Sequence, residues 1–332
     1  MNRSFPLSIS SQESQVMNKH SEVMEGLKAH HAIIAGMLKG KRFHYIDIPI
    51  HDNIGDLLIM LGTLRFFETN NLKPATIATT HSFKHEWVKP GDVLVFHGGG
   101  NFGDLYGHIH QDREKVIMAF PGNQIILMPQ TLFFSSDAAR AQSAANLSRH
   151  PDLHLFVRDL VSQKMAYEFT PHVYLVPDMA HQLYPVATPD KQGQGIVRIQ
   201  RVDKEKPNTP ESLRQLSIRT TTDWIEVIGE DRKLINLFEK LEWRLNHHGW
   251  HSGLTALAKW YWAPVSRRYV KKAIKVFADH ESVVTDRLHG HILACLMDKK
   301  HIVIDNSYGK NSTYMNQWTI ESPLTTLVRE SA

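Results

Sequence analysis

Short apolar runs alternate with amphipathic runs along most of this 332-residue chain. An apolar run bounded by turn residues predicts a buried strand, and an amphipathic run predicts a helix. Strict alternation of the two predicts an α/β fold in which parallel strands are covered by helices on both faces. The expected strands are 44–48, 76–79, 93–97, 125–128, 153–157, 173–176, 196–200, 282–285 and 301–304. The expected helices are 13–38, 56–67, 112–120, 136–148, 160–168, 232–246, 266–278 and 290–297.

The length of the chain exceeds what one core usually supports, so two domains are expected. The segment 184–195 holds two prolines and two glycines and is the best candidate for a linker. We therefore expect an N-terminal helical extension over 1–40, a first domain over 41–185 and a second over 195–332. The simplest arrangement is two α/β domains with a cleft between them, and the C-terminal tail could pack back on the first domain.

Composition excludes several classes of protein. The balance of 38 basic and 34 acidic residues is too even to indicate a nucleic-acid partner. Cys295 is the single cysteine, which excludes an internal disulfide framework, and its apolar surroundings indicate a buried side chain rather than a nucleophile.

The histidine pairs His30-His31 and His247-His248 lack the i, i+4 spacing of a helical metal pair, so we expect no metal. No apolar run is as long as a membrane span, so we expect a cytoplasmic protein.

The segment from Thr285 to His291 is the strongest candidate for a site. It joins an expected strand to an expected helix, and ligands of open α/β sheets bind at the carboxyl ends of strands. Arg287 offers a guanidinium for a phosphate or carboxylate, and His289 can exchange a proton near neutral pH. The alternative is that an Asp286–Arg287 pair holds the turn and His289 only caps the helix.

A glycine-rich segment follows the expected strand 93–97. Gly98, Gly100 and Gly103 match the dinucleotide pattern G-x-G-x-x-G, but the following strand lacks the acidic residue that would bind a ribose. Two interpretations remain open. The segment is either a tight structural turn or a loop in which Asn101 and Asp104 face a polar substrate.

Polar residues also follow several other expected strands. His51, Asp52 and Asp56 come after the strand 44–48, where a general base could stand, although Asp56 also suits a helix N-terminus. The remaining polar residues at strand ends are Arg158, Asp159, Asp178, Arg198, Arg201 and the segment 305–311. Their shared position predicts that they surround one crevice.

These motifs together resemble the polysaccharide pyruvyl transferase family. The segments that carry the resemblance are 53–56, 98–104, 158–159, 177–178 and 285–290. The resemblance implies two Rossmann-like domains in a glycosyltransferase-B-like arrangement. It also implies transfer of a pyruvyl group from phosphoenolpyruvate to a sugar of an exopolysaccharide or its precursor, as a ketal. Phosphoenolpyruvate is then a co-substrate, and no other cofactor is expected.

The resemblance also implies roles for individual residues. Its Arg-x-His-Gly element falls on Arg287, Leu288, His289 and Gly290, with the histidine as the favoured catalytic residue. A second donor-binding arginine is Arg201 or Arg198, and we prefer Arg201 because it lies at the strand's end. The expected sites are catalytic His289, Asp56 and Asp104; donor-binding Arg201, Arg287, Leu288, His289 and Lys310; and acceptor-binding Asp52, Asn53, Gly99, Gly100 and Asn101.

Two other functions remain open. The chain could be a nucleotide-sugar glycosyltransferase of the same two-domain shape, or a catalytically silent carbohydrate-binding or scaffold protein. The acceptor could be a lipid-linked oligosaccharide. The aromatic and basic segment from Trp260 to Lys275 could then touch the inner face of the membrane, although a basic solvated helix explains the same pattern.

Overall fold

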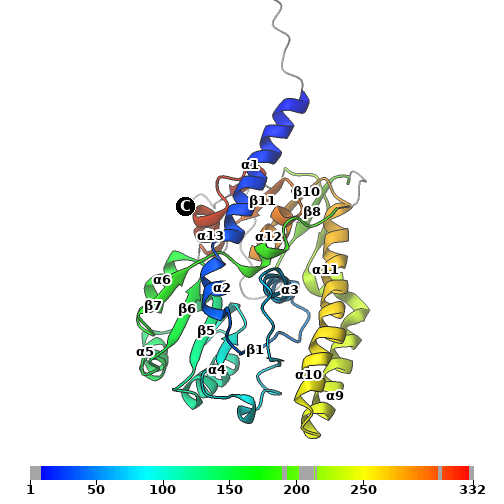
Figure 1. Cartoon of the computed structure of the whole chain (residues 1–332). Coiled ribbons are helices and arrows are strands. Elements are labelled where there is room, and N and C mark those ends of the chain that lie inside the picture. Colours follow the sequence, from blue (N-terminus) through cyan, green and yellow to red (C-terminus); the bar gives the residue numbers. More distant parts are fainter. Residues whose placement is uncertain (1–8, 189–192, 202–212, 214, 306–308, 329–332) are drawn as a thin grey trace, which may run out of the picture. The chain divides into compact units, whose positions relative to one another are not determined.

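The computed structural model describes residues 9–188, 193–201, 213, 215–305 and 309–328, without the side chains of 9–11 and 310 (Figure 1). The chain divides into two compact units. One, which we call the first-sheet unit, comprises residues 30–183 and 223–275; the second-sheet unit comprises 1–29, 184–222 and 276–332. The sequence predicts contiguous domains at 41–185 and 195–332, whereas the observed units are interleaved along the chain.

The sheet of the first-sheet unit is entirely parallel, with strand order β2-β1-β3-β5-β6-β7 and β4 added beside β5. Its strands are β1 Phe43–Ile46, β2 Thr76–Ile77, β3 Val93–Phe96, β4 Gly99–Gly103, β5 Gln124–Phe133, β6 Leu153–Val157 and β7 His172–Leu175. The chain begins at β1, adds β2 on one side and then reverses to β3 on the other. This is the doubly wound pattern, and the point of reversal lies between β1 and β3.

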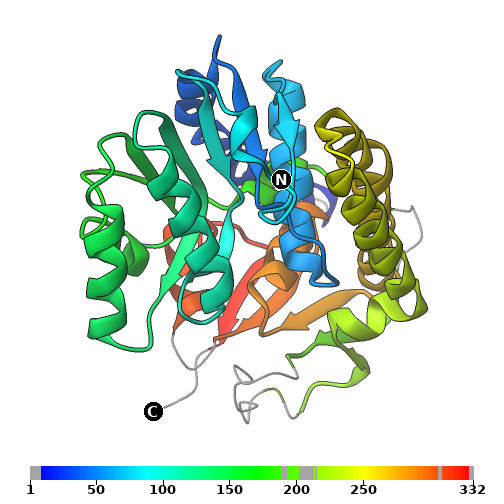
Figure 2. The same cartoon turned by 90° about the horizontal axis from the view of Figure 1, so that it is seen from below.

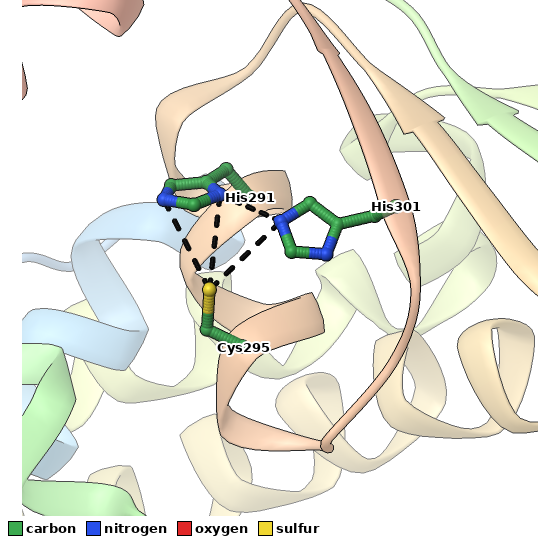
Figure 3. Close-up of side chains that lie close together, drawn as sticks. All are labelled: His291, Cys295 and His301. Atoms are coloured by element: carbon green, nitrogen blue, oxygen red, sulfur yellow. Dashed lines mark hydrogen bonds between the residues drawn. The ribbon is translucent and has the colours of Figure 1, made fainter. Parts of the chain in front are cut away.

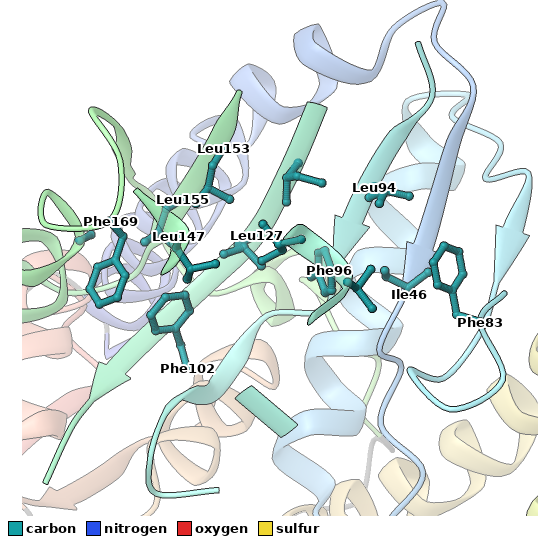
Figure 4. Packing of buried hydrophobic residues seen from close by; sticks show 14 of the residues in the cluster. Ile46, Phe83, Leu94, Phe96, Phe102, Leu127, Leu147, Leu153, Leu155 and Phe169 are labelled. Atoms are coloured by element: carbon teal, nitrogen blue, oxygen red, sulfur yellow. The ribbon is translucent and has the colours of Figure 1, made fainter. Parts of the chain in front are cut away.

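Buried side chains cover both faces of this sheet, as the continuous apolar runs predict. Ile46, Leu94, Phe96 and Leu127 lie side by side on one face, and helices bring Leu147 and other apolar side chains against them (Figure 4). The covering helices include α3 Ile54–Thr69, α4 Gly107–Ala119, α5 Asp137–Leu147 and α6 Leu160–Ala166. The expected fold class, α/β with parallel sheets, is confirmed for this unit.

Residues 223–275 add helices to the same unit. These are α8 Trp224–Ile228, α9 Lys233–His247, α10 His251–Leu257 and most of α11, Ala263–Ala278, with a π-helical turn at Ala258–Trp262. Helices α9 and α10 pack on each other, and α11 continues α10 through the π-helical turn as one long helix (Figures 1 and 2). The indole nitrogen of Trp262 donates to the carbonyl of Pro49 at 2.8 Å, which ties this segment to the chain that follows β1.

The second-sheet unit has its own parallel sheet, with strand order β12-β11-β10-β8-β9. Its strands are β8 Ile196–Ile199, β9 Ile218–Thr222, β10 Ser282–Thr285, β11 His301–Ile304 and β12 Thr325–Val328. This order is also doubly wound, with the reversal between β8 and β10. The helices α1 Ile9–Ala29, α12 Leu288–Leu296 and α13 Lys310–Trp318 belong to this unit.

The helix predicted over 13–38 is two helices, so that prediction was wrong. Helix α1 ends at Ala29, and α2 runs from Ala32 to Leu38 with His31 as its N-cap residue. The ring of His31 is buried and bonds to the carbonyl of Pro177 at 2.9 Å and to the side chain of Gln182 at 2.7 Å. A ring held this way fixes the break between the two helices.

Candidate active site

The reversal point of the second sheet holds the segment that the sequence predicts as the main site. Strand β10 ends at Thr285, and α12 begins at Leu288 with Arg287 as its extended N-cap residue. Strand β8, the neighbour of β10 at the reversal, ends at Ile199 just before Arg201. The carboxyl ends of β8 and β10 therefore bring Arg201 and Arg287 to the edge where doubly wound sheets bind ligands.

Gly290 fits this turn because no larger residue can. A Cβ atom at Gly290 would lie 2.3 Å from the hydroxyl of Thr285. That hydroxyl accepts a hydrogen bond from the backbone N–H of Arg287 at 3.1 Å. Thr285 and Gly290 together fix the path of the chain through Arg287 and His289.

The side chain of Asp286 connects the carboxyl ends of β8 and β10. Its carboxylate accepts a hydrogen bond from the backbone N–H of Arg201 at 2.9 Å. Burial raises the pKa of Asp286, and the bond from Arg201 and the charges of Arg287, Arg201 and Arg198 oppose that rise. Both candidate arginines thus act on the same carboxylate, and the choice between Arg201 and Arg198 as donor ligand stays open.

His289 is half-buried in the first turn of α12, and Leu288 beside it is buried. The Leu288 side chain belongs to the core, so its contribution to a ligand is restricted to the backbone amide in the first turn of the helix. Asn311, at the end of the predicted polar segment 305–311, lies on α13; its buried amide donates to the carbonyls of Asp286 and Ile304, both at 2.9 Å, and so holds the turn. Lys310 begins α13, and its side chain lies outside the described part of the chain.

The reversal point of the first sheet holds a second group of polar side chains. Asn53 is the N-cap residue of α3: its side-chain oxygen accepts from the N–H of Gly55 at 3.0 Å, and its amide donates to Asp56 at 2.9 Å. The Nε2 atom of His51 lies 3.5 Å from the same carboxylate oxygen of Asp56. His51 and Asp56 thus form an acid–base pair of the kind that can accept a proton from a hydroxyl.

The glycine-rich segment lies beside this pair. Gly99 is so near Asp56 that a Cβ atom at Gly99 would be 3.2 Å from the carboxylate. His97 directly follows the end of β3. Its ring forms a hydrogen bond with the hydroxyl of Tyr45 at 2.7 Å, and burial lowers the pKa of His97 to about 3. Its Nε2 atom has no hydrogen-bond partner among the described residues. The neutral ring therefore leaves one nitrogen for a ligand at this edge.

A buried clamp that the sequence did not reveal fixes the carbonyl of His97. The guanidinium of Arg113, on α4, donates to that carbonyl at 3.1 Å and to the carboxylate of Asp47 at 2.5 Å. Gln130 donates to the same carbonyl at 2.7 Å. Asp47 has a left-handed backbone, with φ of 64°. The one sequence signal for this clamp was an arginine on an otherwise ordinary helix, which by itself indicates a solvated face.

Asp52 forms an ion pair with Arg232 at 2.6 Å. Both residues line an open pocket of about 440 Å³ that also involves His51, Lys233 and Asn236. The pocket has carboxylate, amide and cationic groups together, which are the groups that bind sugar hydroxyls and anions.

The structure does not bring Asp104 together with Asp56. Both carboxylate oxygens of Asp104 accept from the N–H of Ser135, at 2.8 and 2.9 Å, so Asp104 holds the turn after β5. Gly100 and Asn101 belong to strand β4, which was expected to be a turn or loop. Arg158 and Asp178 form a buried ion pair, and Asp159 is the N-cap residue of α6.

The segment that holds these motifs matches one known protein family. Residues 53–308 match the family described as polysaccharide pyruvyl transferase. This chain belongs to the polysaccharide pyruvyl transferase family. The resemblance seen in the sequence is therefore confirmed, and the family implies a transferase.

Several curated proteins are similar to the chain over most of their length. The chain is 35% identical over 292 residues to "Putative pyruvyl transferase EpsO" of Bacillus subtilis (strain 168), covering 87% of this chain and 88% of that protein. It is 27% identical over 299 residues to pyruvyl transferase 1 of Schizosaccharomyces pombe, covering 84% and 70%. It is 23% identical over 282 residues to general stress protein 30 of B. subtilis, covering 81% and 76%.

A crystal structure of a functionally uncharacterised Klebsiella pneumoniae protein has the same fold, with a TM-score of 0.57 and 20% identity over 95% of this chain and 99% of that one. Within the described part of this family member, no helix is both long and apolar enough to cross a membrane.

Proposed function

We propose that this protein transfers the pyruvyl group of phosphoenolpyruvate to two hydroxyls of a sugar in an exopolysaccharide or its precursor. Membership of the family supports the pyruvyl transfer. The donor assignment rests on the turn at the reversal point of the second sheet, where the backbone of Arg201 bonds to Asp286 and Arg287 and His289 stand at the start of α12. Phosphoenolpyruvate carries a phosphate and a carboxylate, and two guanidinium groups suit two anions.

In this mechanism His289 donates a proton to the methylene carbon of phosphoenolpyruvate, which becomes the methyl group of the ketal. A sugar hydroxyl attacks the neighbouring carbon, phosphate leaves, and a second hydroxyl closes the ketal on the same carbon. Of the two hydroxyl protons, one replaces the proton that His289 gave, and the other leaves with the phosphate. Arg287, with Arg201 or Arg198 and Lys310, would hold the anionic groups of the donor.

The acceptor would be bound at the reversal point of the first sheet. Asp56, paired with His51 at 3.5 Å, would accept a hydroxyl proton, and Asp52, Asn53 and Gly99 would orient the sugar. This assignment requires a glycosyltransferase-B-like arrangement in which the two sheet edges serve one pair of substrates. The cations Arg232 and Lys233 at the acceptor pocket would suit a sugar that carries a phosphate, as a lipid-linked oligosaccharide does.

Replacing His289 with glutamine tests the proposal. Phosphate release from phosphoenolpyruvate in the presence of acceptor sugars should fall by about 10²- to 10⁴-fold, because general acid–base catalysis contributes that much. Phosphoenolpyruvate should still raise the thermal midpoint of the variant, since Arg287 remains. Normal turnover in the variant would rule out the assignment, and stabilisation by nucleotide sugars instead would favour a glycosyltransferase.

The surface of α9, α10 and α11 supports peripheral membrane contact as part of the same proposal. Trp243, Trp250 and Trp260 are 67%, 65% and 82% exposed, although tryptophan is costly to leave in water. Five cations of α11 line an open groove on this unit: Arg267, Arg268, Lys271, Lys272 and Lys275. Interfacial helices combine tryptophans and cations in this way, and an anionic leaflet attracts them.

Sedimentation with vesicles that contain phosphatidylserine measures this contact. Wild-type protein should sediment at low salt, and replacing Trp243 and Trp260 with serine should lower the bound fraction several-fold. Ile320 is 50% exposed in the second-sheet unit, so Ile320→Ser is the matched control and should bind as wild type does. Equal binding by all three proteins would remove these tryptophans from the proposal.

A further inference from the structure

Two histidines and the single cysteine of the chain meet inside the second-sheet unit. His291 and Cys295 lie one turn apart on α12, and His301 lies on β11 (Figure 3). All three side chains are buried, and their candidate ligand atoms lie within 4.8 Å of one another. The sulfur of Cys295 is 3.8 Å from Nδ1 of His291 and 3.8 Å from Nε2 of His301.

We propose that His291, Cys295 and His301 bind a zinc ion that fastens α12 to β11. Zinc takes histidine nitrogen at about 2.0–2.1 Å and thiolate sulfur at about 2.3 Å. Two such ligands at a tetrahedral angle lie roughly 3.3–3.7 Å apart. The two sulfur–nitrogen separations are already close to that value. The 2.7 Å between the two rings is a hydrogen bond that two metal bonds would replace.

The tautomers of the two rings suit this role. Nδ1 of His301 lies 2.7 Å from the carbonyl of Lys299, so it carries the proton and leaves Nε2 as an acceptor. A ligating histidine characteristically gives its other N–H to a backbone carbonyl in this way. Nε2 of His291 lies 2.9 Å from the hydroxyl of Thr319, which can either donate to that nitrogen or accept from it.

The protons balance when zinc binds. In the metal-free protein Nδ1–H of His291 donates to His301, and Cys295 is a thiol whose pKa burial raises to about 12. Zinc displaces the thiol proton to solvent, because a coordinating thiol is deprotonated. The proton of His291 moves from Nδ1 to Nε2 and is then donated to Thr319. The net result is one proton released, two neutral imidazoles and one thiolate on the ion.

A fourth position is available beside the cluster. The hydroxyl of Thr325, on β12, lies 3.9 Å from the sulfur of Cys295 and 3.4 Å from Nε2 of His301. It can bind the ion directly or hold a water molecule there. The expectation of no metal rested on the spacing of histidine pairs in the sequence. The i, i+4 pair here is His291 and Cys295, and the third ligand comes from the next strand.

Cobalt(II) titration of the tag-free, reduced, metal-free protein tests the proposal. Cobalt that is bound to a thiolate absorbs in the near ultraviolet by charge transfer, and Cys295 is the only cysteine of the chain. The 21 histidines can therefore bind cobalt without giving this band. We expect a charge-transfer band that saturates at one equivalent and disappears when zinc is added. The absence of such a band in the wild-type protein would overturn the proposal without any variant.

Variants then identify the ligands. Cys295→Ala should abolish the band. His301→Gln removes a ligand, so the apparent affinity for cobalt should fall at least tenfold. The matched control is His280→Gln, since His280 is buried in the same unit but bonds to Val276 and Thr220. It should keep the band. Zinc should raise the thermal midpoint of the wild type and of His280→Gln but not of Cys295→Ala. An unchanged band in His301→Gln would overturn the site as drawn. None of these measurements depends on pyruvyl transfer.

Discussion

At the scale of single residues, carboxylates of this chain differ in what already occupies their oxygens. Asp104 gives both oxygens to the backbone of Ser135, whereas Asp56 faces His51 and the Asn53 amide at the end of β1. A carboxylate that holds a turn contributes to stability. One that faces a histidine at a ligand-binding edge can contribute to catalysis.

Asp56→Asn and Asp104→Ala should therefore have opposite effects. We expect Asp56→Asn to lower kcat for pyruvyl transfer by about 10²-fold or more, because it removes a general base. Its effect on stability should stay below about 1 kcal/mol, the value of a carboxylate at a helix N-terminus. Asp104→Ala should keep kcat and lose roughly 1–2 kcal/mol in urea unfolding. Loss of kcat in Asp104→Ala alone would reverse the two roles.

The sequence predicted the residues that lie in motifs and missed those that act through the fold. Arg287 and His289 could be predicted because a strand, a turn and a helix follow one another within a few residues. Arg113, Gln130 and Asp47 come from three separate elements, and only tertiary structure brings them to the carbonyl of His97. Local periodicity carries no information about such contacts.

At the scale of elements, the glycine-rich segment shows that close packing explains part of what the sequence assigned to ligand binding. Gly99–Gly103 is strand β4, paired with β5. Gly103 has φ of 117°, and a Cβ atom there would be 1.8 Å from the carbonyl oxygen of Phe133. Gly99 is the glycine that approaches a candidate catalytic side chain, Asp56. The segment is therefore a strand and not the expected turn or loop, and Asp104 at its end holds the turn after β5.

Gly103→Ala should destabilise the protein by roughly 3 kcal/mol or more, because the backbone conformation and the clash with Phe133 both oppose a side chain. Gly107→Ala is the matched control at the start of α4, where a Cβ atom meets nothing within 4 Å. It should leave stability within about 1 kcal/mol or raise it, since alanine favours a helix. Thermal unfolding of both variants measures the difference, and equal midpoints would contradict the packing argument.

The elements that the sequence missed are polar or short. Strand β9 is Ile-Arg-Thr-Thr-Thr and β12 is Thr-Thr-Leu-Val, and both lie at the edges of the second sheet. Edge strands are partly exposed, so they lack the apolar run that marks a central strand. The nine expected strands were all found. Of these, β1, β2, β3, β7 and β8 end one or two residues earlier than expected, and β5 continues to Phe133, beyond its expected end at residue 128.

At the scale of the whole molecule, the units are interleaved because the chain returns to earlier parts of itself. Residues 223–275 belong with 30–183, and α1 belongs with the second sheet, where His20 bonds to Ser322 and to the carbonyl of Cys295. A linker can be predicted from proline and glycine. The unit that a later helix joins depends on long-range contacts that periodicity does not encode.

Buried histidines make the stability of the protein depend on pH. Burial lowers the pKa of His31 and His301 to about 4 and that of His97 to about 3, against about 6.5 in an unfolded chain. Between pH 6.5 and pH 4 the unfolded state therefore binds more protons than the folded state. Stability falls as the pH falls through this window, by about 1.4 kcal/mol per pH unit for each such histidine.

Carboxylates change the pH dependence of stability in a different way from the buried histidines. Hydrogen bonds lower the pKa of Glu114 and Asp92 despite their burial, so the stability that these two groups add is lost only at lower pH. Burial raises the pKa of Asp286 and Glu242, which opposes the histidines as the pH falls. Urea unfolding between pH 7 and pH 5 therefore reports mainly on the histidines, with the opposing pair reducing the slope.

His31→Gln isolates one of these groups. The variant loses stability at pH 7, because the bonds to Pro177 and Gln182 go, but its free energy of unfolding should fall less steeply below pH 6.5. The slope should decrease by about 1.4 kcal/mol per pH unit relative to wild type. His108 is exposed in the same unit, so His108→Gln should keep the wild-type slope. Parallel curves for wild type and His31→Gln would show that His31 is protonated in the folded protein, with its bonds rearranged to accept the charge.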